Sequence, residues 1–138
     1  MRMKQIIIVT NERDKLENET VGRGLYITWC PFDIKEVQRV RDQSNLIFLC
    51  VKDEDPNELK RISLYLRDLC IEEEKLLYLY GNQQDVDDMR RRLPVLYIRK
   101  IVYSHSAPFS ALLDDLNDLI RETEPYGPTI LFLDDNTE

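Results

Sequence analysis

Residues 45–51 read NLIFLCV, an apolar run that no polar side chain interrupts after its first position. The run is short, and it shows no repeat of the kind that an amphipathic helix needs. Such a segment is typical of a strand that is buried on both faces, as inner strands of a parallel sheet are. Residues 45–51 therefore predict a central strand of a parallel sheet.

Four further segments, on either side of this one, have a similar character. Residues 4–10 (KQIIIVT) form a β-branched run that ends at Asn11, and Gly81 follows the run LLYLY. Together with Asn45–Val51, the expected strands are Lys4–Thr10, Tyr26–Cys30, Leu76–Tyr80 and Tyr97–Tyr103.

The stretches between the strands carry helix signals. Asp33 can cap one helix, and Asp55 with Pro56 opens the most regular one. The segment from residue 11 to residue 23 predicts only a weak helix, because Leu16 and Val21 are its few apolar anchors. The apolar positions of the last two helices are Val86, Met89 and Leu93, and then Leu112, Leu113, Leu116, Leu119 and Ile120. Five strands alternating with five helices predict an α/β fold, a doubly wound, flavodoxin-like parallel sheet.

Composition and charge narrow the class of protein. The chain has 138 residues, 43% hydrophobic and 33% charged, with a net charge of -7. This charge argues against nucleic-acid binding, for which Arg90–Arg92 would be the only local patch. The three cysteines, which include Cys50, lack metal-ligand spacing, so we expect no metal site, no cofactor and a reducing cytoplasm. The apolar run of residues 6–9 is too short for a signal or membrane segment.

Ligands of doubly wound sheets bind at the carboxyl ends of the strands. The residues directly after the strands are Asn11, Cys50 with Lys52, Tyr80 with Gly81, and 104–108. The segment Ala107-Pro108-Phe109-Ser110 precedes the last helix. With this motif and the order of elements, residues 4–124 resemble the receiver domain of two-component response regulators. The resemblance implies the strand order 2-1-3-4-5.

The resemblance also implies a phosphorylation site, and this sequence departs from it at each position. Receivers carry an acidic pair for magnesium after the first strand, where this chain has Thr10 and Asn11. Cys50 stands at the phosphoacceptor aspartate, Tyr80 at a small hydroxyl residue, and Ala107, before Pro108, at a lysine. Magnesium needs hard oxygen ligands, and the phosphoryl group needs positive charge around it. The pattern is that of a pseudo-receiver.

We therefore expect no catalysis, and a phosphorylation-independent interaction module of a multidomain regulator. Its partner would be another protein, a second copy, or an adjacent receiver or output domain. The expected contact surface lies on the fourth and fifth helices, around Met89, Arg91, Tyr103 and Leu113. Cys50 is interpreted as a core cysteine, because neither a cation nor a helix start lies beside it to lower its pKa.

Two other functions stay open. The emptied pocket near Asn11, Cys50 and Tyr80 can hold a small molecule, which would make the chain a sensor. A flavodoxin-shaped hydrolase or oxidoreductase is less favoured, since the sequence has no Gly-rich phosphate loop and no nucleophile elbow.

The last residues have a pattern of their own. Gly127-Pro128 predicts a turn, and the following TILFLDDNTE predicts a strand that ends in the acidic pair Asp134 and Asp135. Residues 1–124 are thus expected to form the receiver-like domain. Residues 125–138 are expected to be a linker and the first strand of a following receiver, with Asp134 and Asp135 as its metal pair.

Overall fold

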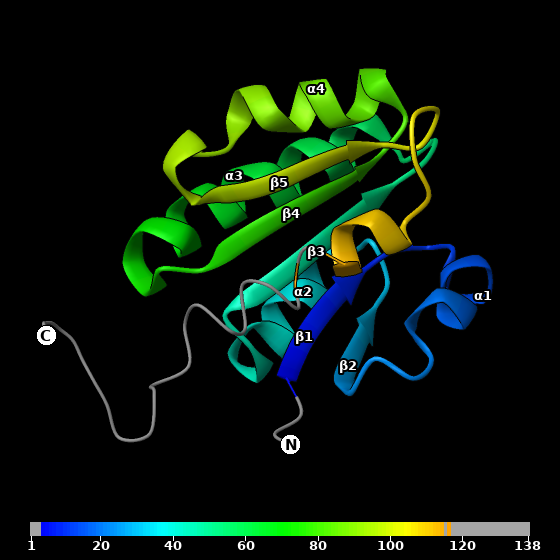
Figure 1. Cartoon of the computed structure of the whole chain (residues 1–138). Coiled ribbons are helices and arrows are strands. Elements are labelled where there is room, and N and C mark those ends of the chain that lie inside the picture. Colours follow the sequence, from blue (N-terminus) through cyan, green and yellow to red (C-terminus); the bar gives the residue numbers. More distant parts are fainter. Residues whose placement is uncertain (1–3, 115, 117–138) are drawn as a thin grey trace, which may run out of the picture.

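The computed structural model describes residues 4–114 and residue 116. It contains five parallel strands in the order β2-β1-β3-β4-β5. This order confirms the doubly wound sheet expected from the sequence. Figure 1 shows the sheet between two layers of helices. The strands are β1 (Lys4–Val9), β2 (Leu25–Cys30), β3 (Leu46–Val51), β4 (Leu76–Gly81) and β5 (Ile98–Tyr103).

The helices divide between the two faces of the sheet. α2 (Ile34–Val40), α3 (Pro56–Glu73) and α4 (Gln83–Arg92) contribute to one apolar core. The other core contains Leu16 of α1 (Arg13–Leu16), together with side chains of the last helical segment, residues 110–114. The 3-10 turns are η1 (Glu17–Thr20), η2 (Arg41–Gln43) and η3 (Val95–Tyr97).

Local sequence explains where the longer helices begin. The side chain of Asp33 accepts a hydrogen bond from the Lys35 backbone N–H at 2.8 Å, and Asp55 accepts one from that of Asn57. Pro56 occupies the first turn of α3, where its missing N–H is harmless. Asn82 caps α4 through the N–H of Asp85. These are the caps that free N–H groups at a helix start require.

The expected boundaries differ from the observed ones by about a residue, except between residues 11 and 23. There the expected helix is replaced by α1 and η1, and Val21 is 75% exposed rather than an apolar anchor. Of this segment only Leu16 is buried among apolar side chains. One anchor does not stabilise a long helix, since helical stability in proteins comes mostly from a packed face. Leu119 and Ile120, and the expected linker and strand of residues 125–138, lie outside the described residues.

Candidate functional site

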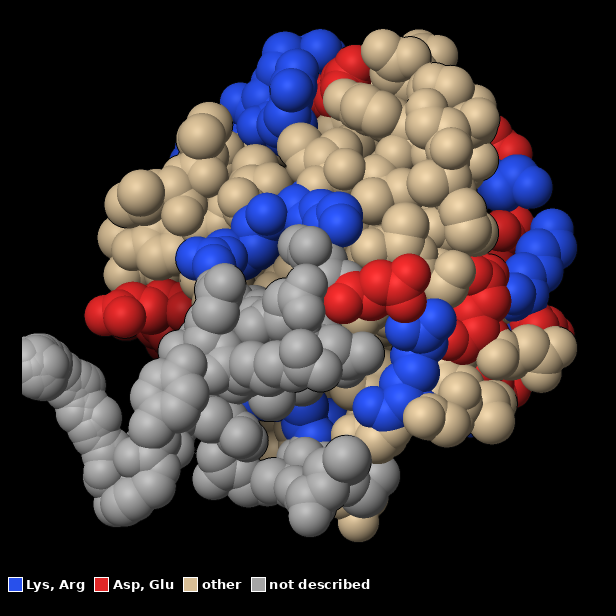
Figure 2. Space-filling view, viewed as in Figure 1, with Lys and Arg blue, Asp and Glu red and all other residues tan. Residues whose placement is uncertain are grey.

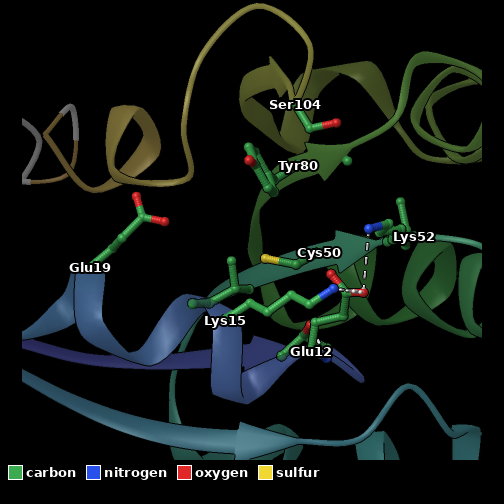
Figure 3. A pocket seen from close by; sticks show the side chains of 11 residues that line it. Glu12, Lys15, Glu19, Cys50, Lys52, Tyr80 and Ser104 are labelled. Atoms are coloured by element: carbon green, nitrogen blue, oxygen red, sulfur yellow. Dashed lines mark hydrogen bonds and ion pairs between the residues drawn. The ribbon is translucent and has the colours of Figure 1, made fainter.

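The carboxyl ends of β1, β3 and β4 border a cavity of about 250 Å³. Thr10, Cys50 and Tyr80, three positions predicted from the sequence, line this cavity. Figure 3 shows the cavity with its main side chains. Glu12, Lys15, Glu19, Lys52 and Ser104 also line it. We call this space the strand-end cavity.

Thr10 and Asn11, which the sequence resemblance aligns with the acidic pair of receivers, make hydrogen bonds within the protein. Thr10 is buried, and its Oγ1 accepts from the backbone N–H of Glu12 at 2.9 Å. The Asn11 amide donates to Glu54 at 2.8 Å, and its oxygen accepts from the N–H of Phe32 at 3.0 Å. Asn11 lies in a neighbouring groove rather than in the strand-end cavity. Both side chains hold loops together at the strand ends.

Cys50 is a buried thiol. Its residue is 4% exposed, and burial, with a smaller contribution from Glu19, raises its pKa well above the usual value. Thiolate, rather than thiol, is the nucleophile in cysteine chemistry. This environment therefore favours the protonated thiol of Cys50, which is the less reactive form.

This environment gives a test on the native protein. Cys50, Cys30 and Cys70 are all buried, and burial is the main cause that raises the pKa of both Cys30 and Cys70 to about 12. We expect a thiol reagent at pH 8 to modify the folded protein slowly, and all three cysteines quickly in denaturant. Rapid modification of Cys50 in the folded protein, located by peptide mass spectrometry, would show that the thiol is accessible and ionised.

Tyr80 borders the cavity without filling it. Its ring packs edge-on against Phe109, with ring centres 5.5 Å apart. Partial burial is the main cause that raises the pKa of its hydroxyl, with smaller contributions from Glu19, Cys50 and Glu12. The ring thus packs against Phe109 at the side of the cavity and does not fill the cavity beside Cys50.

The Glu12 carboxylate lies between the two lysines that line the cavity. The Nζ atoms of Lys15 and Lys52 lie 3.5 and 3.8 Å from its Oε2. Figure 3 shows both lysines directed toward Glu12. Glu12 is thus close to both lysines that line the cavity. Among the residues that the structure describes, no three His, Cys, Asp or Glu side chains are grouped so that they could hold a metal ion.

Glu19 and Arg23 fasten the last helical segment to the region before β2. The Glu19 carboxylate accepts from the backbone N–H of Ser110 at 2.9 Å, and Arg23 pairs with Asp114 at 2.7 Å. Ala107, which the resemblance aligns with the lysine of receivers, and Pro108 lie in the turn that leads into this segment. The N–H of Ala107 donates to the carbonyl of Tyr103, and neither residue lines the cavity.

The predicted contact surface is partly wrong. Met89 is 0% and Leu113 1% exposed, because both side chains point into the cores below their helices. Arg91 is exposed and pairs with Asp88 at 3.1 Å. Tyr103 donates from its hydroxyl to Asp87 at 2.7 Å, which is the main cause that raises its pKa. Two of the four residues are therefore available at the surface.

A groove of about 560 Å³, which Arg91 helps to line, lies between the end of α4 and the start of β5. We call it the α4–β5 groove. Its apolar lining consists of Leu93, Val95, Ile98 and Ile101. Its basic lining consists of Arg90, Arg91, Arg99 and Lys100. Apart from Arg90 and Arg91, this apolar and basic surface was not predicted.

Two solved structures of other proteins have folds similar to that of this chain. No protein-family model matches the sequence, and no curated protein matches it. A solved structure of CpaE from Burkholderia thailandensis, described as a pilus assembly protein, is similar with a TM-score of 0.58 at 15% identity. The match covers 86% of this chain and 99% of that one. A pilus assembly-related protein from Burkholderia pseudomallei gives 0.55 at 16% identity, covering 85% and 88%.

At these identities the likeness concerns the fold alone. The five-stranded order and these neighbours give the chain a receiver-like fold, as the sequence predicted. No helix within the described part of the chain has both the length and the apolar character that crossing a membrane requires.

Proposed function

We propose that this chain is a pseudo-receiver, a cytoplasmic docking module of a multidomain two-component regulator that works without phosphoryl transfer and is not an enzyme. The observation that carries the proposal is Cys50. At the position that corresponds to the phosphoacceptor it is a buried thiol, and burial raises its pKa well above the usual value. Such a group neither accepts a phosphoryl group as a carboxylate does nor acts as a ready nucleophile.

The residues around Cys50 support the same proposal. Thr10 and Asn11 use their polar atoms in hydrogen bonds within the protein. Ala107 places a methyl group at the position where a receiver has the lysine that binds phosphoryl oxygens. The two lysines that line the strand-end cavity, Lys15 and Lys52, both pair with Glu12. Glu12 thus offsets part of the lysine charge, and no cation stands at the position of Ala107 to stabilise a phosphoryl group in transfer.

The docking surface of this proposal is the α4–β5 groove. Val95 is 78% and Leu96 84% exposed, and both belong to η3 at the groove. Interfaces commonly have an apolar centre with arginine nearby, and Arg91 and Arg99 supply that here. A protein partner or a second copy would bind at this surface. A role in pilus assembly, as described for both similar structures, would rest on docking as well.

Site-specific cross-linking tests the docking surface. A photoreactive amino acid at Leu96 is expected to form a cross-link to one defined protein in cells, with the linked peptide identified by mass spectrometry. The matched control is Val21, an apolar residue of similar exposure near β2, the other edge strand. Equal cross-linking from both positions, or none from Leu96, would contradict the proposal.

A second candidate function, small-molecule sensing, is favoured by one observation. The strand-end cavity remains open beside Tyr80, whose ring packs on Phe109. Its volume of about 250 Å³ is just below the usual range of ligand pockets, so a small metabolite would fit. Binding to the folded state would raise the melting temperature.

Two neighbouring serines provide the test of sensing. Ser104 lines the cavity and Ser106 does not, and both are exposed. A ligand found in a panel of metabolites should raise the melting temperature of the parent protein and of Ser106→Trp. It should have little effect on Ser104→Trp, whose indole obstructs the cavity. Equal shifts in both variants, or no shift with any compound, would reject sensing at this site.

A further inference from the structure

The α4–β5 groove follows the outer edge of the sheet. Four consecutive residues of β5, 98–101, line it. Successive side chains of a strand point to opposite faces. Ile101 accordingly packs against the core beneath α4, while its neighbour Val102 belongs to the core on the other face. A groove that consecutive residues share therefore runs along the edge of the strand rather than over one face of the sheet.

The backbone of β5 offers hydrogen-bonding groups at this edge. β5 is the last strand in the order, and among the described strands it pairs only with β4. The N–H and C=O groups that point away from β4 can accept a further strand, and extended peptides bind many proteins in this way. We therefore expect a partner in the groove to contribute an extended segment.

The apolar lining of the groove continues onto exposed surface. Val95 lines the groove together with Leu93 and Ile98, and both Val95 and the adjacent Leu96 are exposed. Single exposed apolar residues are common, whereas a continuous patch within a groove marks an interaction site. The segment must therefore carry apolar side chains.

The charged residues that line the groove are all basic, although the chain has a net charge of -7. Arg90 and Arg91 pair with acids of their own helix at 3.9 and 3.1 Å. Within the described part of the chain, no carboxylate forms an ion pair with the exposed Arg99. Figure 2 shows basic side chains over α4 and over β5, with uncharged surface between them. The segment should therefore carry carboxylates as well.

The same charge argues against a second copy of this chain as the occupant. In a two-fold pair, each chain presents the same surface to the other. The basic residues of both grooves would then lie along one shared edge. Like charges that face each other across an interface oppose binding. A different protein is therefore the better partner.

We propose that the α4–β5 groove binds an extended segment of a different protein, which carries both apolar and acidic residues and adds a strand beside β5. The inference rests on the proposed docking function and names the chemistry of the partner. Apolar side chains of the segment cover Val95 and Ile98, and a carboxylate pairs with Arg99.

A displayed library of short random peptides tests the inference on the full chain. We expect selection to enrich peptides in which aspartate or glutamate stands among apolar residues. Arg99→Glu should weaken the binding of these peptides by about tenfold or more. The matched control is Arg67→Glu, at an exposed arginine of α3 that does not line the groove, and it should bind them as the parent does. Enriched peptides without acidic residues, or equal affinities of the two variants, would overturn the inference.

Amide hydrogen exchange shows whether a selected peptide binds as a strand. The β5 amides that exchange quickly in the free chain are expected to become protected when the peptide is bound. Those of β2, the other edge strand, should be unchanged. No gain of protection in β5, or an equal gain in β2, would also overturn the inference.

Cross-linking from Leu96 in cells separates the inference from the docking function on which it rests. A cross-link to a segment with apolar and acidic residues in a different protein would support both. A cross-link to a segment without acidic residues, or to a second copy of this chain, would reject the inference and leave docking in place. Arg99-dependent binding to vesicles of phosphatidylserine and phosphatidylcholine, without any enriched peptide, would reject the inference in favour of a membrane surface. The absence of both a cross-link and an enriched peptide would reject the inference and the docking function together.

Discussion

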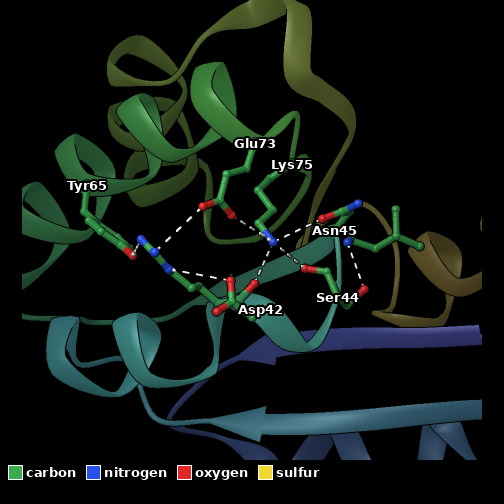
Figure 4. A network of polar contacts seen from close by, with 8 residues as sticks. Asp42, Ser44, Asn45, Tyr65, Glu73 and Lys75 are labelled. Carbon is green, nitrogen blue, oxygen red and sulfur yellow. Dashed lines mark hydrogen bonds and ion pairs between the residues drawn. The ribbon is translucent and has the colours of Figure 1, made fainter.

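Replacing Lys75 with methionine is expected to lower the free energy of unfolding by about 3 kcal/mol. Lys75 lies just before β4, and its side chain is 3% exposed. Its Nζ donates to the carbonyls of Arg41 and Ser44 at 2.6 and 3.0 Å, and to Asn45 Oδ1 at 3.1 Å. The three donors of the ammonium group thus have three acceptors (Figure 4).

The cost arises from the groups that remain after the substitution. Methionine fills a similar volume but leaves three acceptors without their donor, and Glu73 loses a cation at 3.5 Å. Arg41 also lies 3.8 Å from Glu73 and compensates part of that charge. Glu73 is one-third exposed, so solvent screening reduces its share, and the unpaired acceptors dominate the cost.

Urea unfolding measures this effect as a shift of the midpoint at constant slope. Lys60→Met is the matched control, because Lys60 is an exposed lysine on α3 and should change stability by less than about 0.5 kcal/mol. Equal midpoints for the two variants would show that the network around Lys75 contributes little.

Gly81→Ala should also destabilise the protein by about 3 kcal/mol, through its backbone. Gly81 ends β4 opposite Val51 of β3 and has φ of +152°. A Cβ atom at this position would lie 2.1 Å from the carbonyl oxygen of Val51 and 2.8 Å from its Cγ2. β3 and β4 must separate locally to accommodate the added methyl group. Gly81 also lines the strand-end cavity, so this movement would change the shape of the cavity.

Gly22→Ala separates this clash from backbone strain alone. Gly22 has φ of +78°, but nothing lies within 4 Å of a Cβ atom added there. The substitution should lower the free energy of unfolding by only about 1 kcal/mol, which is typical of alanine at a positive φ. Thermal or urea unfolding of both variants measures the difference. A loss for Gly81→Ala no greater than that for Gly22→Ala would contradict the close approach of β3 and β4.

The strands could be predicted from sequence because their signal is local. Runs such as residues 46–51 are apolar throughout, and a parallel strand buried by helices on both faces requires that pattern. The observed strand ends differ from the predicted ones by one residue where backbone hydrogen bonding, rather than side-chain polarity, determines where the strand begins or ends. Tyr97 lies in η3 because its N–H donates to the carbonyl of Pro94.

The surface was harder to predict, because it depends on how each helix is rotated against the sheet. Met89 shares a helix face with Val86 and Leu93, and all three are buried, so its spacing already indicated a core position. Leu113 is buried on the same face as Leu116, three residues further along, for the same reason. By contrast, no local pattern indicates that Glu19 reaches Ser110, 91 residues away. Such contacts follow only from the packed fold.

The most direct test of the account is the intact mass of the full chain after incubation with Mg²⁺ and a small phosphodonor such as acetyl phosphate. We predict no added phosphoryl group on residues 4–124. Cys50 replaces the aspartate that accepts the group, and Ala107 replaces the lysine that binds its oxygens. A receiver with an intact acidic site, treated in parallel, should gain the group. Stoichiometric aspartyl phosphate on residues 4–124 would contradict the account.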